Sequence, residues 1–249
     1  FASPEPAARA LARAAAYAEW RRRPPGTVPD LDGFDRERAQ RVVDGYLGDQ
    51  PDGGWLPADR ITELLGAIGV PVLETVSVSS DTEAASQAGR LGFPVVLKAS
   101  GPNLVHKSDV GGVVLDLGTT DDVAAAYREM ARRVGSAMTG AVVQRMARPG
   151  VETIVGVVLD PMFGPLVMFG MGGVAVELLR DRAFRILPLT DNDAGELVRS
   201  LRASPLLFGY RGSPLVAVDA LEDVLQRVAR LAPIDDYFAT TGRSRRHPD

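Results

Sequence analysis

The chain has 249 residues, with 28 basic and 32 acidic side chains for a net charge of −4, and 45% of its residues are apolar. This composition is typical of one large or two small globular domains, which excludes disorder as the default, and its mildly acidic balance argues against nucleic acid as the main partner. The absence of cysteine excludes disulfides, cysteine-ligated zinc and a thiol nucleophile, and it fits a cytoplasmic protein.

Two helices separated by proline-rich segments are predicted in the first fifty residues. The first covers residues 4–22, where Ser3 can cap the helix and Pro4 suits its first turn, and the second covers residues 35–47. Breaker-rich segments at 24–29 and 49–54 follow them, so we place a boundary near residue 51. Because neither an initiator methionine nor a signal peptide precedes this region, we expect the chain to be a piece of a longer protein.

Helices and strands alternate after residue 55, which predicts an α/β (or α+β) protein. The closely spaced strands over 94–117 and 141–169 indicate antiparallel sheet rather than uniform βαβ winding. The longest uncharged stretch, residues 161–176, is too short to span a membrane. The predicted helices cover 57–68, 81–91, 121–134, 193–202 and 218–231, and the predicted strands cover 72–78, 94–99, 111–117, 141–145, 151–159 and 166–169.

The loop at 99–112 carries the strongest signal for chemistry. It follows Lys98 and contains Lys107, the only two lysines among the 28 basic residues, whereas arginine serves everywhere else. Compact ammonium groups, the Ser108 hydroxyl and the backbone amides of Gly111 and Gly112 together suit a phosphate group. The bland alternative is a tight turn with two surface lysines, and the order of residues in a P-loop is absent.

His106 lies in the same loop, next to Lys107. A lone histidine is usually structural or exposed, but an imidazole among phosphate-binding groups can serve as a nucleophile or a proton shuttle. The second histidine, His247, belongs to a polar tail, and its distance in sequence argues against a histidine-ligated metal.

Four further features stay ambiguous when they are taken alone. Gln144 and Met146 end one predicted strand and Glu152 begins the next, where an ordinary strand-end carboxylate is the simpler interpretation. The glycine-rich segment 164–176 brings the backbone close either to a ligand or to another strand. The segment 209–212, Gly-Tyr-Arg-Gly, is simply a loop with one arginine.

Taken together, five ordered motifs resemble the ATP-grasp domain of ADP-forming (NDP-forming) acyl-CoA synthetases. The same domain occurs in bacterial protein acetyltransferases built on an acyl-CoA synthetase-like core. The resemblance covers about residues 55–231. The motifs are Leu97-Lys98 with the loop 104–113, Gly150-Val151-Glu152 leading to Gly156, residues 160–165, residues 169–173 with Val176-Glu177, and residues 209–212.

The resemblance implies an ATP-grasp fold of two lobes with mixed or antiparallel sheets, preceded by a helical segment. Residues 1–50 would be a helical linker from a preceding domain, and residues 51–249 the ATP-grasp domain. Within that domain the resemblance implies a lid lobe at about 72–146, a second lobe at about 147–232 and a polar tail at 233–249.

The resemblance also implies roles for individual residues. Lys98 would contact the nucleotide phosphates, Gln144 and Met146 would border the adenine, and Glu152 would hold ribose or magnesium. The loop histidine would relay the phosphoryl group to the nucleotide. The implied catalytic residues are His106 and Lys107, and the implied nucleotide-binding residues are Lys98, Gln144, Met146, Glu152, Ser108, Gly111 and Gly112.

The implied function is phosphoryl transfer between phosphohistidine and ADP or ATP, in the reaction acyl-CoA + ADP + phosphate = acid + CoA + ATP. The implied partners are CoA-binding and ligase domains, in the same full-length chain or on a separate subunit, and self-association is left open. The alternative is a regulatory nucleotide-binding module of a protein acetyltransferase. Mg²⁺ is expected, but the family's Glu-x-Asp-x-Asn-Pro-like strand and a following aspartate strand are absent from this chain. We therefore assign no metal ligand and expect the chain alone to be catalytically incomplete.

Overall fold

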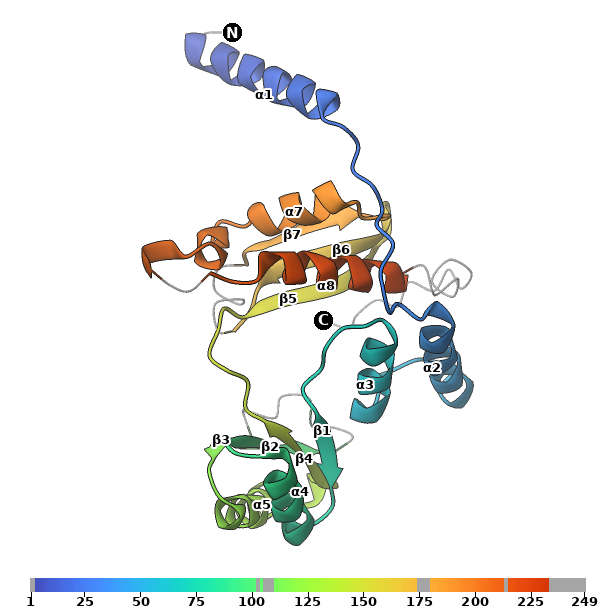
Figure 1. The fold of residues 1–249 in the computed structure, drawn as a ribbon, viewed down its shortest axis with the longest axis vertical. Coiled ribbons are helices and arrows are strands. Elements are labelled where there is room, and N and C mark those ends of the chain that lie inside the picture. The colour runs from blue at the N-terminus through green and yellow to red at the C-terminus, as the bar shows by residue number, and fades with distance from the viewer. Residues whose placement is uncertain (1–2, 102–103, 105–109, 174–179, 213–214, 233–249) are drawn as a thin grey trace. The chain divides into compact units, whose positions relative to one another are not determined.

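The computed structural model describes residues 3–101, 104, 110–173, 180–212 and 215–232. Its contacts divide the chain into two units (Figure 1). Residues 31–151 form the first, here called the Lys98 unit. The described residues up to 30 and those from 152 to 232 form the second, here called the Glu152 unit.

The Lys98 unit contains a four-stranded antiparallel sheet in the order β1-β4-β2-β3, formed by Thr75–Val78, Gly140–Arg145, Val95–Ser100 and Val113–Leu117. Helices α4 (Asp81–Leu91) and α5 (Thr120–Val134) pack against one another and against this sheet (Figure 1). Their buried residues form one core with alternate residues of the strands, including Val95, Leu97 and Ala99 of β2. Because side chains alternate along a strand, Lys98 lies on the face opposite the helices.

Helices α2 (Arg36–Asp49) and α3 (Ala58–Ala67) pack together in the same unit. Asp35 begins this pair, because its carboxylate accepts a hydrogen bond from the Arg38 amide and so caps α2. The Asp35 amide in turn donates to the Ala67 carbonyl at the end of α3, 2.8 Å away. These bonds fix the second helix of the expected linker to α3.

The Glu152 unit contains the antiparallel sheet β5-β6-β7, formed by Thr153–Asp160, Gly164–Met171 and Arg182–Ile186. Helices α7 (Asp191–Arg199) and α8 (Val218–Leu231) cover one face of this sheet (Figure 1). Phe169 of β6, Leu197 of α7 and Leu225 of α8 are fully buried. No helix in the described part of the chain is long and apolar enough to cross a membrane.

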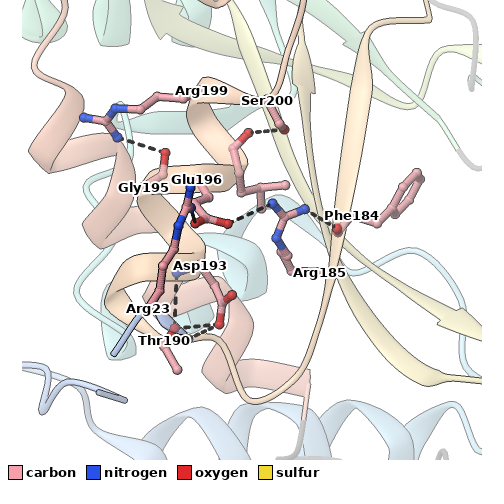
Figure 2. A network of polar contacts seen from close by, with 10 residues as sticks. Arg23, Phe184, Arg185, Thr190, Asp193, Gly195, Glu196, Arg199 and Ser200 are labelled. Atoms are coloured by element: carbon pink, nitrogen blue, oxygen red, sulfur yellow. Dashed lines mark hydrogen bonds and ion pairs between the residues drawn. The ribbon is translucent and has the colours of Figure 1, made fainter. Parts of the chain in front are cut away.

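A strap, residues 23–30, follows α1 (Pro4–Arg22) and is bonded to the Glu152 unit. The Thr27 amide and hydroxyl donate to the Asp191 carboxylate, and the Asp191 amide returns a bond of 2.9 Å to the Thr27 carbonyl. At one end of the strap Arg23 pairs with Glu196 at 2.6 Å (Figure 2), and at the other Arg230 donates to the Pro29 carbonyl. The proline-rich segment is therefore an ordered part of this unit.

The observed helices and strands agree closely with the predicted ones. All predicted helices are present, with ends that differ by three residues at most, and the antiparallel sheets are confirmed. Strand β7 and three short 3₁₀ turns, at 135–137, 204–207 and 210–212, were not predicted. Of the strands predicted over 141–169, β5 and β6 pair with one another, whereas β4 lies between β1 and β2. The domain boundaries that the resemblance implies stay a prediction.

Candidate functional site

Lys98 lies in a chain of three polar side chains on the face of the first sheet opposite α4 and α5. Its Nζ donates to Gln144 Oε1 at 2.9 Å, and Gln144 Nε2 donates to Thr75 Oγ1 at 3.1 Å. All three side chains are half-buried. Because the amide oxygen of Gln144 is neutral, it orients the ammonium without neutralising its charge.

The register of three adjacent strands produces this arrangement. Gln144 of β4 lies directly opposite Thr75 of β1 on one side and Val96 of β2 on the other. Lys98 is two residues further along β2 from Val96 and shares its face, so a long side chain can reach Gln144 diagonally. Residues far apart in sequence therefore meet on the sheet face opposite α4 and α5.

Gly111 and Gly112 lie next to Lys98 at the start of β3. The Ala99 amide donates to the Gly112 carbonyl at 2.7 Å, and Lys98 lies opposite Val113. Gly111 has φ = +67°, and a Cβ there would come within 2.7 Å of the Arg133 side chain. The positive φ favours glycine at this position, because other residues rarely adopt this conformation, whereas the flexible Arg133 side chain could move aside.

Met146 follows the end of β4. Its backbone amide donates to the Pro94 carbonyl at 2.9 Å, which extends the pairing of β4 with β2 beyond the last strand residue. Its side chain is half-buried. The remaining loop residues of the expected site, His106, Lys107 and Ser108, lie outside the described residues, and their roles stay predictions.

Glu152 belongs to the other unit, at the start of β5. Its carbonyl accepts a 2.7 Å hydrogen bond from the Gly172 amide, and its side chain is exposed. A Cβ on Gly172 would lie 2.9 Å from the Glu152 backbone carbon, and a Cβ on Gly173 would lie 2.9 Å from Glu152 Oε2. The glycines that follow β6 therefore bring the backbone up against Glu152, next to the start of β5.

The described residues contain no cluster of three or more histidine, aspartate or glutamate side chains that could hold a metal ion. A magnesium ion that arrives with a nucleotide needs only one or two protein carboxylates, because phosphates and water complete its shell. The exposed Glu152 carboxylate can supply one such ligand.

Shifted pKa values occur away from these residues and have structural causes. The Arg128 guanidinium lowers the pKa of Asp81, and the Ser79 amide and hydroxyl lower the pKa of Glu83. Burial raises the pKa of Tyr127. Asp81 pairs with Arg128, Glu83 accepts bonds from Ser79 at the start of α4, and burial accounts for Tyr127, so these shifts have structural causes and do not mark a catalytic centre.

Sequence reasoning found Lys98 and Gln144 but assigned them to different parts of the nucleotide, and it did not find Thr75. The structure joins Lys98 and Gln144 by a hydrogen bond. Thr75 carries no signal of its own in the sequence, because only the pairing of β1 with β4 places it beside Gln144.

A model of the ATP-grasp domain matches residues 49–235. The chain is 41% identical over 217 residues to acetate–CoA ligase [ADP-forming] I of Archaeoglobus fulgidus. The aligned region covers 82% of this chain and 30% of that protein. It is 39% identical over 175 residues to the acetate–CoA ligase [ADP-forming] I subunit beta of Pyrococcus furiosus, which covers 68% of this chain and 75% of that subunit.

A solved structure from Ca. Korarchaeum cryptofilum is also similar. It is a dinucleotide forming acetyl-coenzyme A synthetase 1 in complex with coenzyme A and Mg-AMPPCP, with the phosphohistidine segment pointing towards the nucleotide binding site. The similarity has a TM-score of 0.69 at 37% identity and covers 80% of this chain and 87% of that chain.

Proposed function

The chain belongs to the ATP-grasp family and matches the beta subunit of ADP-forming acetate–CoA ligases, and on that premise we propose that it binds ADP or ATP for an ADP-forming acyl-CoA synthetase reaction. In this reaction acyl-CoA, ADP and phosphate give the free acid, CoA and ATP. The observation that carries the proposal is the hydrogen-bonded group Lys98–Gln144–Thr75 on one face of the first sheet.

The chemistry of phosphoryl transfer explains why such a group is useful. The protein has to position the nucleotide and stabilise charge on the phosphate oxygens, and it forms few bonds of its own. We assign the Lys98 ammonium to the phosphates, where Gln144 orients it before the ligand arrives. Preorganisation of this kind lowers the cost of binding, because a long flexible side chain is already restricted.

The loop residues complete the proposed transfer. We assign His106 as the imidazole that relays the phosphoryl group, forming an N–P bond as the bond to the donor histidine breaks and releasing the group to a β-phosphate oxygen of ADP. Lys107 offsets charge during this transfer. Ser108 and the backbone amides of Gly111 and Gly112 hold phosphate oxygens.

The other proposed ligand contacts are those of Gln144 and Met146 with adenine and of Glu152 with ribose or magnesium. Magnesium bound with the nucleotide would neutralise phosphate charge. Glu152 would hold this ion in place, and Gly172 and Gly173 fix the backbone that carries Glu152.

The chain spans 30% of one curated relative, 75% of another and 33% of a third, so the complete reaction requires further parts. We propose that CoA-binding and ligase domains, on the same full-length chain or on another subunit, deliver the phosphorylated histidine. The regulatory alternative within an acetyltransferase is not favoured, because the relatives reported above are ligases and a ligase subunit. A cytoplasmic location stays a prediction.

Calorimetric titration of the chain with ADP and ATP, with and without Mg²⁺, tests the proposal. Lys98→Ala removes the proposed charge-assisted hydrogen bond from the ammonium to a phosphate oxygen. A bond of this kind is worth about 1.5–3 kcal/mol, so we expect nucleotide affinity to fall by roughly tenfold to a hundredfold. Arg90→Gln is the matched control, because it removes one exposed positive charge that pairs with Glu74 in the same unit. Equal losses in both variants, or no nucleotide binding by the unmodified chain, would contradict the assignment.

A further inference from the structure

The turn at residues 209–212, Gly-Tyr-Arg-Gly, has no part in the proposed nucleotide site. A bridge between Phe208 and Leu215 closes its base, and the Val216 amide donates to the carbonyl of the fully buried Leu207. Within the turn, the Gly212 amide donates to the Gly209 carbonyl at 3.2 Å. The turn is therefore anchored to the core of the Glu152 unit at its base.

Arg211 adopts a left-handed backbone conformation, with φ = 51° and ψ = 34°, between Gly209 and Gly212, which also have positive φ. Glycine or asparagine would fit this position at lower cost, since longer side chains rarely occupy it. Asp116 also has positive φ, but it lies where the pairing of β2 with β3 is irregular, so a bulge explains it. No such local reason accounts for Arg211.

The guanidinium of Arg211 lies 5.4 Å from the centre of the Tyr210 ring. Stacking on an aromatic ring restrains the planar group and leaves its N–H edges available to an oxyanion with two acceptor oxygens. Among the described residues, no carboxylate forms an ion pair with Arg211, whereas the nearby Arg199 is paired with Glu222 at 2.7 Å. The turn therefore presents an uncompensated and oriented positive charge.

Large apolar side chains are exposed at and beside the turn. Leu206 and Phe208 are each 39% exposed, Tyr210 is 50% exposed and Leu215 is 78% exposed. A free anion gains nothing from apolar neighbours, whereas protein interfaces are enriched in tyrosine and arginine and bury apolar groups around them. The anion that suits Arg211 is thus one carried on a protein segment.

We propose that the 209–212 turn docks a phosphorylated segment of a partner protein, with Arg211 binding the phosphoryl oxygens and the exposed apolar residues contacting the segment. The inference rests on the proposed function, which requires a partner to bring a phosphorylated histidine to this chain. It adds the surface that receives the segment, in a different unit from Lys98.

NMR of the ¹⁵N-labelled chain tests this proposal at a single residue. The probe is a short peptide that carries phosphonotriazolylalanine, a stable analogue of phosphohistidine. There are two control probes: the same peptide with an unmodified histidine, and inorganic phosphate alone. We expect the phosphonate peptide to shift the Arg211 Nε–Hε signal and to bind at least tenfold more tightly than either control probe. Equal shifts with inorganic phosphate would indicate a site for free anions, and equal shifts with the histidine peptide would indicate no phosphoryl recognition; either result overturns the proposal.

Two variants separate recognition from folding. Arg211→Asn keeps a residue that tolerates the left-handed conformation, so we expect an unchanged or higher unfolding midpoint together with loss of the tenfold preference. Arg202→Gln, which removes an exposed arginine from the neighbouring turn, should keep the preference. Retention of the preference in Arg211→Asn refutes the assignment. Nucleotide titration of the same variant reports on the proposed function separately, because Arg211 lies outside the proposed nucleotide contacts.

Discussion

Replacing Gly172 with alanine tests whether the glycines after β6 are required to position Glu152. The new Cβ would lie 2.9 Å from both the backbone carbon and the Cβ of Glu152, and 3.0 Å from the Thr153 amide nitrogen. Two of these three atoms belong to the backbone, so the strand itself has to shift. Overpacking of this kind costs about 1–3 kcal/mol, and weakening of the bond from the Gly172 amide to the Glu152 carbonyl adds about 1 kcal/mol.

The combined cost of about 2–4 kcal/mol lowers the unfolding midpoint by roughly 4–16 °C for a chain of this size. Gly156→Ala is the matched control on the same sheet, because its Cβ would meet only the flexible end of Met168, at 3.7 Å. Thermal unfolding followed by circular dichroism measures both variants, and the control should stay within about 0.5 kcal/mol of the unmodified chain. Similar midpoints for the two variants would refute the close approach on which this reasoning depends.

The same pair of variants reports on ligand binding. If Glu152 holds ribose or magnesium, its displacement in Gly172→Ala should reduce affinity for Mg-ADP at a temperature where the variant is still folded. Gly156→Ala should bind as the unmodified chain does. A destabilised Gly172→Ala chain with unchanged affinity would keep the packing argument and remove Glu152 from the proposed nucleotide contacts.

Two further predictions concern the strap and the loop. The Thr27 amide, followed by the Asn192 amide, holds the pKa of Asp191 below its ordinary value of 3.8, so this carboxylate stabilises the strap above that pH and loses its effect as the pH falls towards the lowered folded pKa. Hydrogen exchange at Thr27 should therefore show acid-induced opening that Asp191→Asn removes, and identical pH profiles would count against it. His106→Ala should abolish phosphoryl transfer to ADP in the complete enzyme while nucleotide affinity is nearly unchanged; equal loss of both would argue for a structural histidine.

Local sequence signals predicted the helices well because caps and breakers sit at their ends. Helix α4 shows this clearly: Ser80 accepts a bond from the Glu83 amide at its start, and Gly92 adopts positive φ at its end. The predicted and observed bounds of this helix are the same. Both signals act within a few residues, so a single sequence contains them in full.

Strand β7 was missed because its sequence, Arg-Ala-Phe-Arg-Ile, combines two arginines with apolar residues. The Arg185 guanidinium is accommodated by Glu196, at 3.7 Å, and by the Phe184 carbonyl (Figure 2). Glu196 comes from α7, which is in contact with β7. A tertiary ion pair therefore supports this strand, and no local pattern predicts it.

The sequence identified residues of the candidate site but did not predict how these residues are arranged. Lys98 stood out because lysine is rare in this chain, and Gln144 because it ends a strand. Their hydrogen bond depends on β4 lying between β1 and β2, an order that crosses long stretches of sequence. Sheet order of this kind is decided by packing over the whole unit, so the close spacing of β4 and β5 in sequence does not show which strands they pair with.

Within the described residues the chain passes from one unit to the other at residues 30–31 and 151–152, and both crossings are bonded on the side of the Glu152 unit. At residue 30 the strap is bonded to Asp191 of α7, and at residue 152 the Glu152 carbonyl is bonded to Gly172. Release of the strap by Asp191→Asn removes no proposed nucleotide contact, whereas Gly172→Ala disturbs a crossing and a proposed nucleotide contact together. The two variants thus separate the effect of an unfastened crossing from the loss of a proposed nucleotide contact.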